Sequence, residues 1–244
     1  VFYRDGALTD WESSQDGVPS AAQLRVIGRT GSTHFAGTMT EGVLRSTDLG
    51  VHWSTANAGY PTYNGTAGLQ YREVGAFAGN AQIAFVGTGV SIELINGSFT
   101  ITGGGVYRST NGGLLWTEAN NGFPIIGTDN FGEFVYDPVI SMAHTSSATL
   151  TSTFQRGIFR STNGGSGWSA ANTGLPQSGG RFPQFSGFLE DQGVIFAGAI
   201  GFVAGSGGTG LFRSTNGGLG WALANNGIPV GRRVTGLLAE DGIL

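Results

Sequence analysis

The sequence predicts an all-β protein: a single domain over 1–244 that forms a five-bladed β-propeller of four-stranded antiparallel blades. One sequence unit recurs five times along the chain, and each copy carries one of the five tryptophans. The tryptophans are 42 to 63 residues apart, which is the length of a four-stranded blade. No segment shows helical periodicity over a dozen residues.

Four copies of the unit align without gaps, and a shorter copy opens the chain. The copies read VFYRDGALTDW (1–11), GVLRSTDLGVHW (42–53), GVYRSTNGGLLW (105–116), GIFRSTNGGSGW (157–168) and GLFRSTNGGLGW (210–221). They end in Trp11, Trp53, Trp116, Trp168 and Trp221. A Gly-apolar-Pro triplet follows each tryptophan, at 17–19, 59–61, 122–124, 174–176 and 227–229.

Each unit supplies the third strand of a blade, and its tryptophan begins the fourth. Short apolar segments elsewhere in the repeat predict the two remaining strands. The expected inner strands lie at 139–144, 185–189 and 234–239, and the expected second strands at 34–38, 83–88 and 194–199.

The two ends of the chain complement each other. Residues 232–244 can supply an inner strand and the start of a second strand, and the N-terminus, from VFYR onward, the third and fourth strands. A ring closed by both ends sharing one blade would leave no exposed sheet edge. The composite blade lacks most of its second strand, so a larger parent protein is the alternative.

The turn between the third and fourth strands has a physical logic. Its Asp or Asn can accept hydrogen bonds from amides of its own turn, and its glycine can adopt a positive φ. The Asp or Asn positions are Asp48, Asn111, Asn163 and Asn216. We expect the tryptophans to pack between blades, and the repeated arginines Arg45, Arg108, Arg160 and Arg213 to brace a turn or a neighbouring blade.

This turn resembles the Asp-box, or BNR, repeat S-x-D-x-G-x-T-W. That family includes propellers of sialidases, xyloglucan-cleaving hydrolases, sortilin-type receptors and photosystem II assembly factors. The resemblance implies a propeller whose boxes are structural and lie opposite the active site. The chain departs from the motif: three of the four full boxes carry Asn, and His52, Leu115, Gly167 and Gly220 replace the Thr before Trp.

Composition excludes several classes of function. The net charge is −4, and all twelve cations are arginines without a basic cluster, which argues against nucleic-acid binding. There is no cysteine, and His34, His52 and His144 are scattered, so we expect no metal and no cofactor. No apolar run approaches the ~20 residues of a membrane span.

Low charge and the absence of lysine favour an extracellular or periplasmic protein. Asn64 and Asn96 fit glycosylation sequons, although Asn-Gly is also a common turn pair.

Connections of variable length should all emerge on one face of the propeller, where binding usually resides. They are 61–71, 89–104, 124–138, 176–183, 200–209 and 229–233. Their aromatic rings, carboxylates and arginines suit a sugar, or else they pack the loops onto the ring. The candidate ligand-binding residues are Tyr63, Tyr71, Arg72, Asp129, Phe131, Glu133, Tyr136, Asp137, Arg181 and Arg232.

These observations favour a non-catalytic binding or scaffold propeller that recognises a carbohydrate or a protein partner, and we assign no catalytic residue. One alternative is a BNR or sialidase-like glycoside hydrolase, which would need two carboxylates flanking one bond. The carboxylates that could converge are Glu73, Asp129, Glu133 and Asp137. The other alternative is a structural subunit of an extracellular assembly that packs against copies of itself.

Overall fold

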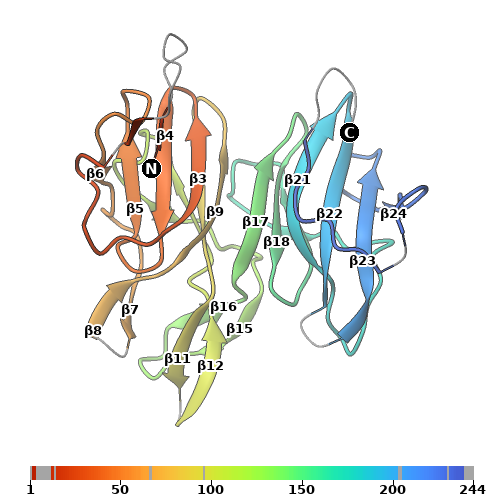
Figure 1. Cartoon of the computed structure of the whole chain (residues 1–244). Coiled ribbons are helices and arrows are strands. Elements are labelled where there is room, and N and C mark those ends of the chain that lie inside the picture. The colour runs from red at the N-terminus through yellow and green to blue at the C-terminus, as the bar shows by residue number, and fades with distance from the viewer. Residues whose placement is uncertain are drawn as a thin grey trace.

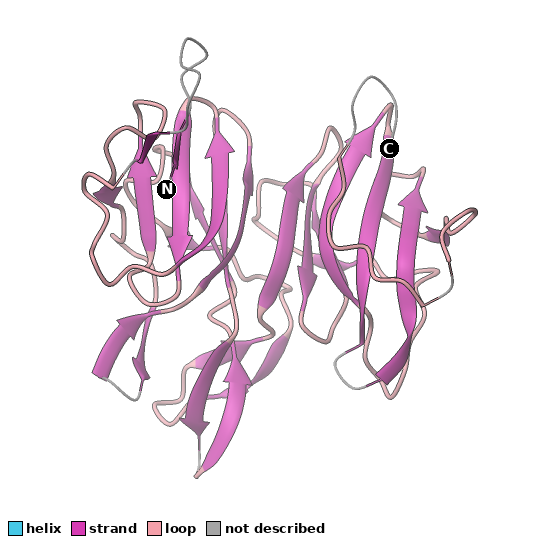
Figure 2. Ribbon diagram, in the orientation of Figure 1, coloured by secondary structure: helices cyan, strands magenta, loops and turns pink. Residues whose placement is uncertain are grey.

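The computed structural model describes residues 2–3, 12–13, 15–65, 68–95, 97–202, 205–229 and 231–238. These residues form strands, turns and loops without any helix (Figure 2). No membrane-spanning helix is therefore present in this part of the chain. Trp11, Asn96 and the side chain of Asn64 lie outside the described part.

Four antiparallel sheets of four strands each form a row of blades (Figure 1). Blade 1 contains β3 (Leu24–Thr30), β4 (Thr33–Thr38), β5 (Val43–Ser46) and β6 (Ser54–Thr55). Blade 2 contains β9 (Val74–Gly79), β10 (Ala84–Thr88), β13 (Val106–Ser109) and β14 (Thr117–Glu118). Blade 3 contains β17 (Val139–His144), β18 (Thr149–Thr153), β19 (Ile158–Ser161) and β20 (Ser169–Ala170). Blade 4 contains β21 (Gln184–Asp191), β22 (Val194–Phe202), β23 (Gly205–Ser214) and β24 (Ala222–Leu223).

A two-stranded sheet, β1 (Phe2–Tyr3) with β2 (Glu12–Ser13), precedes blade 1 in the sequence and lies at the two ends of the first copy of the repeat. We call this pair of strands the half-blade. Blades 1 and 4 lie at opposite ends of the row in Figure 1. No strand pairing among the described residues links blade 4 to β1 or β2. The all-β fold with four-stranded antiparallel blades is thus confirmed, whereas a fifth blade and a closed ring are not seen in the described chain.

The prediction of an inner strand at 234–239 is wrong for residues 234–238, because the described residues 231–238 contain no strand. This segment still lies against blade 4. The Val234 amide donates to the Ala199 carbonyl at 3.1 Å, and the Val234 carbonyl accepts from Ser186 Oγ at 2.7 Å. A strand needs a hydrogen-bonded neighbouring strand along its length, and no second strand of that blade lies beside residues 231–238 in the described chain.

Three tryptophans of the described chain occupy equivalent places between successive blades. Trp116, Trp168 and Trp221 are buried, and each indole N–H donates to an alanine carbonyl of the preceding blade. These bonds join Trp116 to Ala56 at 2.8 Å, Trp168 to Ala119 at 2.7 Å and Trp221 to Ala171 at 2.9 Å. Trp53 is also buried, against Ala36 and Leu44 of blade 1. The core is therefore a series of similar clusters, one at each junction between blades.

The turns between third and fourth strands, which we call the repeated turns, share one hydrogen-bond pattern. The Asp or Asn oxygen accepts an amide four residues later, and the preceding serine hydroxyl accepts the amide of the positive-φ glycine. The first pattern joins Asp48 to His52, Asn111 to Leu115, Asn163 to Gly167 and Asn216 to Gly220. The second joins Ser46 to Gly50, Ser109 to Gly113, Ser161 to Gly165 and Ser214 to Gly218.

Three of the four repeated arginines connect neighbouring blades, as expected from the sequence. Arg45, Arg108 and Arg160 each donate to a turn carbonyl of the following blade. Their acceptors are Gly112 at 2.6 Å, Gly164 at 2.9 Å and Gly217 at 2.6 Å. Because the guanidinium reaches the next turn, every blade–blade junction of this row is fixed at its outer end as well as by its tryptophan.

Three additional hairpins project from the end of the blades opposite the repeated turns (Figure 1). They are β7 (Thr62–Gly65) with β8 (Gly68–Tyr71), β11 (Ser91–Ile95) with β12 (Ser98–Thr102), and β15 (Ile125–Thr128) with β16 (Phe134–Tyr136). The sequence predicts these segments only as variable connections. We call this end of the molecule the hairpin face.

Candidate functional site

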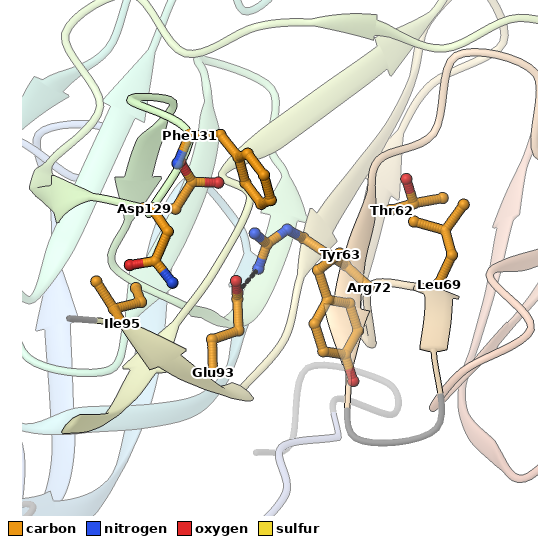
Figure 3. A pocket seen from close by; sticks show the side chains of 9 residues that line it. Thr62, Tyr63, Leu69, Arg72, Glu93, Ile95, Asp129 and Phe131 are labelled. Carbon is orange, nitrogen blue, oxygen red and sulfur yellow. Dashed lines mark hydrogen bonds and ion pairs between the residues drawn. The ribbon is translucent and has the colours of Figure 1, made fainter. Parts of the chain in front are cut away.

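A cavity of about 310 Å³ opens among the three hairpins of this face. Its wall is formed by side chains of β7–β8, of β11–β12 and of the turn between β15 and β16 (Figure 3). The lining residues are Thr62, Tyr63, Leu69, Arg72, Glu93, Ile95, Asp129, Asn130 and Phe131. A volume of this size is at the lower end of the range for small-molecule sites.

A buried ion pair forms one wall of the cavity. Arg72 Nη1 lies 2.5 Å from Glu93 Oε1, and the two side chains are 8% and 9% exposed. The Thr102 hydroxyl donates to the same Glu93 oxygen and accepts from Arg72. Arg72 follows β8 and Glu93 lies on β11, so the pair ties two hairpins together. Since each charge is compensated, this wall is electrically neutral and rigid.

Gly104 explains why the arginine fits at this place. A Cβ atom at Gly104 would lie 2.6 Å from Arg72 Cδ, closer than real side chains allow. The missing side chain therefore leaves room for the guanidinium stem between the base of the β11–β12 hairpin and the end of β8.

Two aromatic rings border the cavity. The Tyr63 ring packs against the guanidinium, with 5.5 Å between Arg72 Cζ and the ring centroid, a cation–π distance. Its hydroxyl donates to Gln70 Oε1 at 3.1 Å. Burial raises the pKa of Tyr63 above its ordinary value of 10.0, so the phenol stays protonated at neutral pH. Phe131 is 74% exposed and stands at the rim.

Asp129 holds the turn that carries Phe131. Asp129 Oδ1 accepts the Phe131 amide at 2.8 Å and the Glu133 amide at 2.9 Å. The Asp129 amide in turn donates to the Glu133 carbonyl at 2.9 Å. This Asx-type arrangement fixes a carboxylate at the wall of the cavity.

Of the ten predicted ligand-binding residues, the structure brings four together in this cavity: Tyr63, Arg72, Asp129 and Phe131. Tyr71 lies beside it, in a second hollow of about 350 Å³ shared with Thr62 and Leu69. Glu133, Arg181 and Arg232 line neither space. Arg181 and Arg232 belong to the connections before β21 and after β24.

Tyr136 and Asp137 are buried and hold the scaffold. The Tyr136 ring packs on Phe123, with 6.2 Å between their centroids. Asp137 Oδ2 accepts the amides of Gln155 at 2.9 Å and Arg156 at 2.8 Å, which closes the connection between β18 and β19. Burial raises the pKa of Asp137, and the hydrogen bonds from Thr153 and these amides oppose that shift.

The four carboxylates expected to converge do not share one site: Glu133 lies in the turn of Asp129 without lining its cavity, and Glu73 and Asp137 lie elsewhere. Glu73 lines another cavity, of about 360 Å³, between β9 and β17, where its Oε1 lies 3.0 Å from Arg25 Nε. Burial raises the pKa of Glu73, and the charge of Arg25 opposes this. Asp137 is buried in blade 3, and among the four candidates only Asp129 lines the cavity among the hairpins.

Glu93 is the main cavity residue absent from the predicted set. It lies in SIELI, next to an Asn-Gly pair and a second alternating segment, SFTIT. Two such segments around Asn-Gly are the strongest short-range signal for a hairpin, and they would have placed Glu93 on the face opposite Ile92. The described residues contain no group of three or more His, Asp or Glu side chains suited to hold a metal ion.

No protein-family model matches the sequence, and no curated protein matches it either. Solved structures do resemble the fold. An ancestral GH74 enzyme superposes with a TM-score of 0.53 at 14% identity, over 91% of this chain and 28% of that one. The Niastella koreensis GH74 enzyme gives 0.52 at 16% identity, over 82% and 30%. YCF48 from Cyanidioschyzon merolae gives 0.49 at 15% identity, over 88% and 59%.

The two GH74 enzymes are β-propellers, so their likeness supports a propeller-type fold for the chain. At such low identity the resemblance concerns the fold alone. The chain spans less than a third of the length of the GH74 enzymes it resembles.

Proposed function

We propose that this protein is a non-catalytic binding module that takes a neutral carbohydrate in the cavity among its three hairpins. The observation that carries this proposal is the cavity wall itself. Two aromatic rings, a hydroxyl and a fixed carboxylate surround a space whose buried arginine is already neutralised by Glu93. Aromatic rings pack on the apolar faces of sugar rings, and carboxylates accept hydrogen bonds from hydroxyl groups.

The charge of the wall favours a neutral over an anionic ligand. Arg72 is paired with Glu93, so Asp129 contributes the net charge among the ionisable residues lining the cavity. A ligand carboxylate or phosphate would meet this negative charge, whereas a hydroxyl-rich ligand would donate to it.

A glycan array followed by calorimetry tests the proposal. We expect binding that is lost in Tyr63→Ala and in Phe131→Ala. Phe99→Ala is the matched control, since Phe99 is equally exposed at 77% on β12 but does not line the cavity. Absence of binding to every glycan, or equal loss in the control, would contradict the proposal.

A protein partner is the second candidate, and the exposed apolar side chains of the hairpin face support it. Contiguous exposed apolar surface often marks a protein interaction site. The exposed residues on the hairpins are Leu69, Ile92, Phe99, Ile101, Ile125, Phe131 and Phe134. Under this alternative, Phe99→Ala and Phe134→Ala weaken partner binding as much as the cavity variants do.

A glycoside hydrolase is the third candidate, because Glu93 and Asp129 line one cavity. Its two carboxylates would have to act as acid and as base or nucleophile. Glu93 is held in place by its ion pair to Arg72, so Asp129 is the carboxylate of the cavity that has no cationic partner among the lining residues. Hydrolysis of model glycosides that disappears in Asp129→Asn would establish this candidate over simple binding.

We also propose that the repeated turns are Asp boxes, that the protein acts outside the cytoplasm, and that its ring has five blades. The serine and Asp or Asn hydrogen bonds support the first point, and the low charge with no lysine supports the second. The position of β1 and β2 before blade 1 supports the third.

A further inference from the structure

The outer edge of blade 4 repeats every group with which blades 1, 2 and 3 receive the next tryptophan. At each formed junction, one blade presents an alanine carbonyl, a second carbonyl two residues later, a positive-φ glycine and an arginine. The indole N–H of the next tryptophan donates a hydrogen bond to the alanine carbonyl, and the backbone amide of the same tryptophan donates to the second carbonyl. These second acceptors are Ala58 for Trp116, Asn121 for Trp168 and Thr173 for Trp221, at 2.9, 2.8 and 2.8 Å.

At each junction, the backbone of the next blade approaches so closely that only glycine fits. A Cβ atom at Gly59, Gly122 or Gly174 would lie about 2 Å from the carbonyl oxygen of the next tryptophan (2.1, 2.2 and 2.0 Å). The half-blade before blade 1 follows the same rule, because the Trp53 amide donates to the Asp16 carbonyl at 2.9 Å next to Gly17. Four tryptophans therefore fill four equivalent slots.

Blade 4 has the corresponding slot without an occupant among the described residues. Its alanine is Ala224, its second carbonyl belongs to Asn226, its arginine is Arg213, and its glycine is Gly227 with φ +85°. No described atom lies within 4 Å of a Cβ placed on Gly227.

The apolar floor of this slot is also uncovered. In blades 1 to 3, the side chains of Phe35, Phe85 and Leu150 lie against the turn glycine of the next blade and are at most 1% exposed. Phe196 is the equivalent residue of blade 4, because it is the cross-strand partner of Arg213 just as those three residues are the partners of the repeated arginines in their own blades. Phe196 is nevertheless only half-buried. Leu211, Ala224 and Ile228 are likewise half-buried, whereas their counterparts in the other three blades are buried.

We propose that this edge of blade 4 is a docking surface for a tryptophan-bearing turn segment, and that its occupant is residues 1–11 of the same chain. The sequence contains five repeats of this type, and four of their tryptophans fill the slots of the half-blade and of blades 1 to 3. Trp11 is the one that remains, and blade 4 offers the remaining slot. Residues 1–11 belong to the same repeat as the four segments that fill such slots.

The docked segment would bring the half-blade β1–β2 next to residues 231–238, which already lie against blade 4 through Val234. The two parts would then contribute different strands to one composite blade. The proposal is independent of the ligand, because the slot belongs to the blade edge and not to the cavity among the hairpins.

An engineered disulfide tests the proposal in the full chain, which contains no cysteine. Thr173 and Gly220 form a bridge across the junction of blades 3 and 4, and a Cβ on Gly220 would lie 3.8 Å from Thr173 Cβ. That separation matches a disulfide, so Thr173→Cys with Gly220→Cys is the positive control. By the repeat, the equivalent pair at the open edge is Asn226→Cys with Asp10→Cys.

We expect the Asp10→Cys/Asn226→Cys protein to form an intramolecular disulfide under mild oxidation, as the control does, at any protein concentration. Non-reducing electrophoresis and intact mass distinguish it from a cross-linked dimer. Adding Gly227→Val should abolish the disulfide, since its side chain would occupy the place of the tryptophan carbonyl. Gly231→Val is the matched control, because Gly231 also has a positive φ in open space and should leave the disulfide intact.

Two outcomes overturn the proposal. A disulfide that joins two copies would show that the slot takes its segment from a second molecule. No disulfide at all, when the Thr173→Cys/Gly220→Cys control forms one, would show that residues 1–11 do not reach blade 4. Ligand binding measured on the same proteins separates this result from the proposal about the cavity.

Discussion

The two ends of the blades solve different physical problems with the same scaffold. At one end, the repeated turns use the same serine, Asp or Asn, and glycine in blade after blade, and Arg45, Arg108 and Arg160 reach the next turn. At the other end, three hairpins of unlike sequence surround a cavity, and apolar side chains such as Phe99 and Phe131 face solvent. Uniform contacts stabilise the row of blades, whereas irregular ones create a site that can be specific.

The largest expected effect is a loss of stability when a tryptophan at a blade junction is replaced, compared with an aromatic residue on the hairpin face. Trp168→Ala removes an indole that is packed against Phe85 and Phe123 and hydrogen-bonded to Ala119. We expect the free energy of unfolding to fall by about 3–5 kcal/mol, the usual cost for Trp→Ala in a core. Phe99→Ala on the hairpin face should change it by less than about 0.5 kcal/mol. Urea denaturation of both variants tests this contrast, and similar losses in the two would contradict it.

The ion pair makes a finer distinction within the hairpin face. Arg72→Met leaves Glu93 buried without its partner, so we expect a loss of about 3 kcal/mol in the stability of the hairpins that the pair joins. Hydrogen exchange of the β11–β12 amides measures it. Replacing both residues, as Arg72→Met with Glu93→Leu, should restore most of the protection, because no buried charge remains. Failure of the double variant to recover would show that the pair itself, and not an orphaned charge, stabilises the hairpins.

Two turns of similar chemistry allow a direct comparison of the faces. Asn163 accepts the Gly167 amide in a repeated turn, and Asp129 accepts two amides in the hairpin turn at the cavity. Asn163→Ala should cost about 1 kcal/mol of global stability and leave ligand binding unchanged. Asp129→Ala should loosen only its own turn, with ligand binding reduced and the denaturation midpoint nearly unchanged. Equal effects of the two variants on both measurements would remove the distinction between the faces.

The sequence predicts the scaffold better than the site for a physical reason. A repeat forces Trp116, Trp168 and Trp221 into equivalent surroundings, so a pattern of five is more informative than any single copy. The cavity depends instead on how three unrelated hairpins meet, and neither periodicity nor composition determines that.

Asp137 shows why the sequence alone could not identify the residues of the candidate site. It lies in a polar connection in the sequence, but it is fully buried because two amides near β19 need an acceptor. Tyr136 looks like a loop aromatic, but it packs on Phe123 at the base of a hairpin. Only contacts between distant segments separate such residues from Tyr63 and Phe131, which face the cavity.

The smallest expected effect concerns the first repeated turn, the one with Asp and His where the other three have Asn. His52 Nδ1 lies 2.6 Å from Asp48 Oδ2, and His52 Nε2 lies 3.4 Å from Asp16 Oδ2 before blade 1. The hydrogen bond to Asp48 raises the pKa of His52 above its ordinary 6.5, and the backbone and side chain of His52 lower the pKa of Asp48 far below its ordinary 3.8.

The stabilisation from protonated His52 is therefore complete below pH 6.5 and disappears as the pH rises through the raised pKa. The contribution of ionised Asp48 is present above pH 3.8 and is lost only on acidification through its lowered pKa. We expect the denaturation midpoint to be slightly higher at about pH 5 than at about pH 9, and the difference to shrink in His52→Leu, which copies Leu115 of the second turn. Because these side chains are exposed, the shift should be small and weaken with added salt; an unchanged pH dependence in His52→Leu would assign it to other groups.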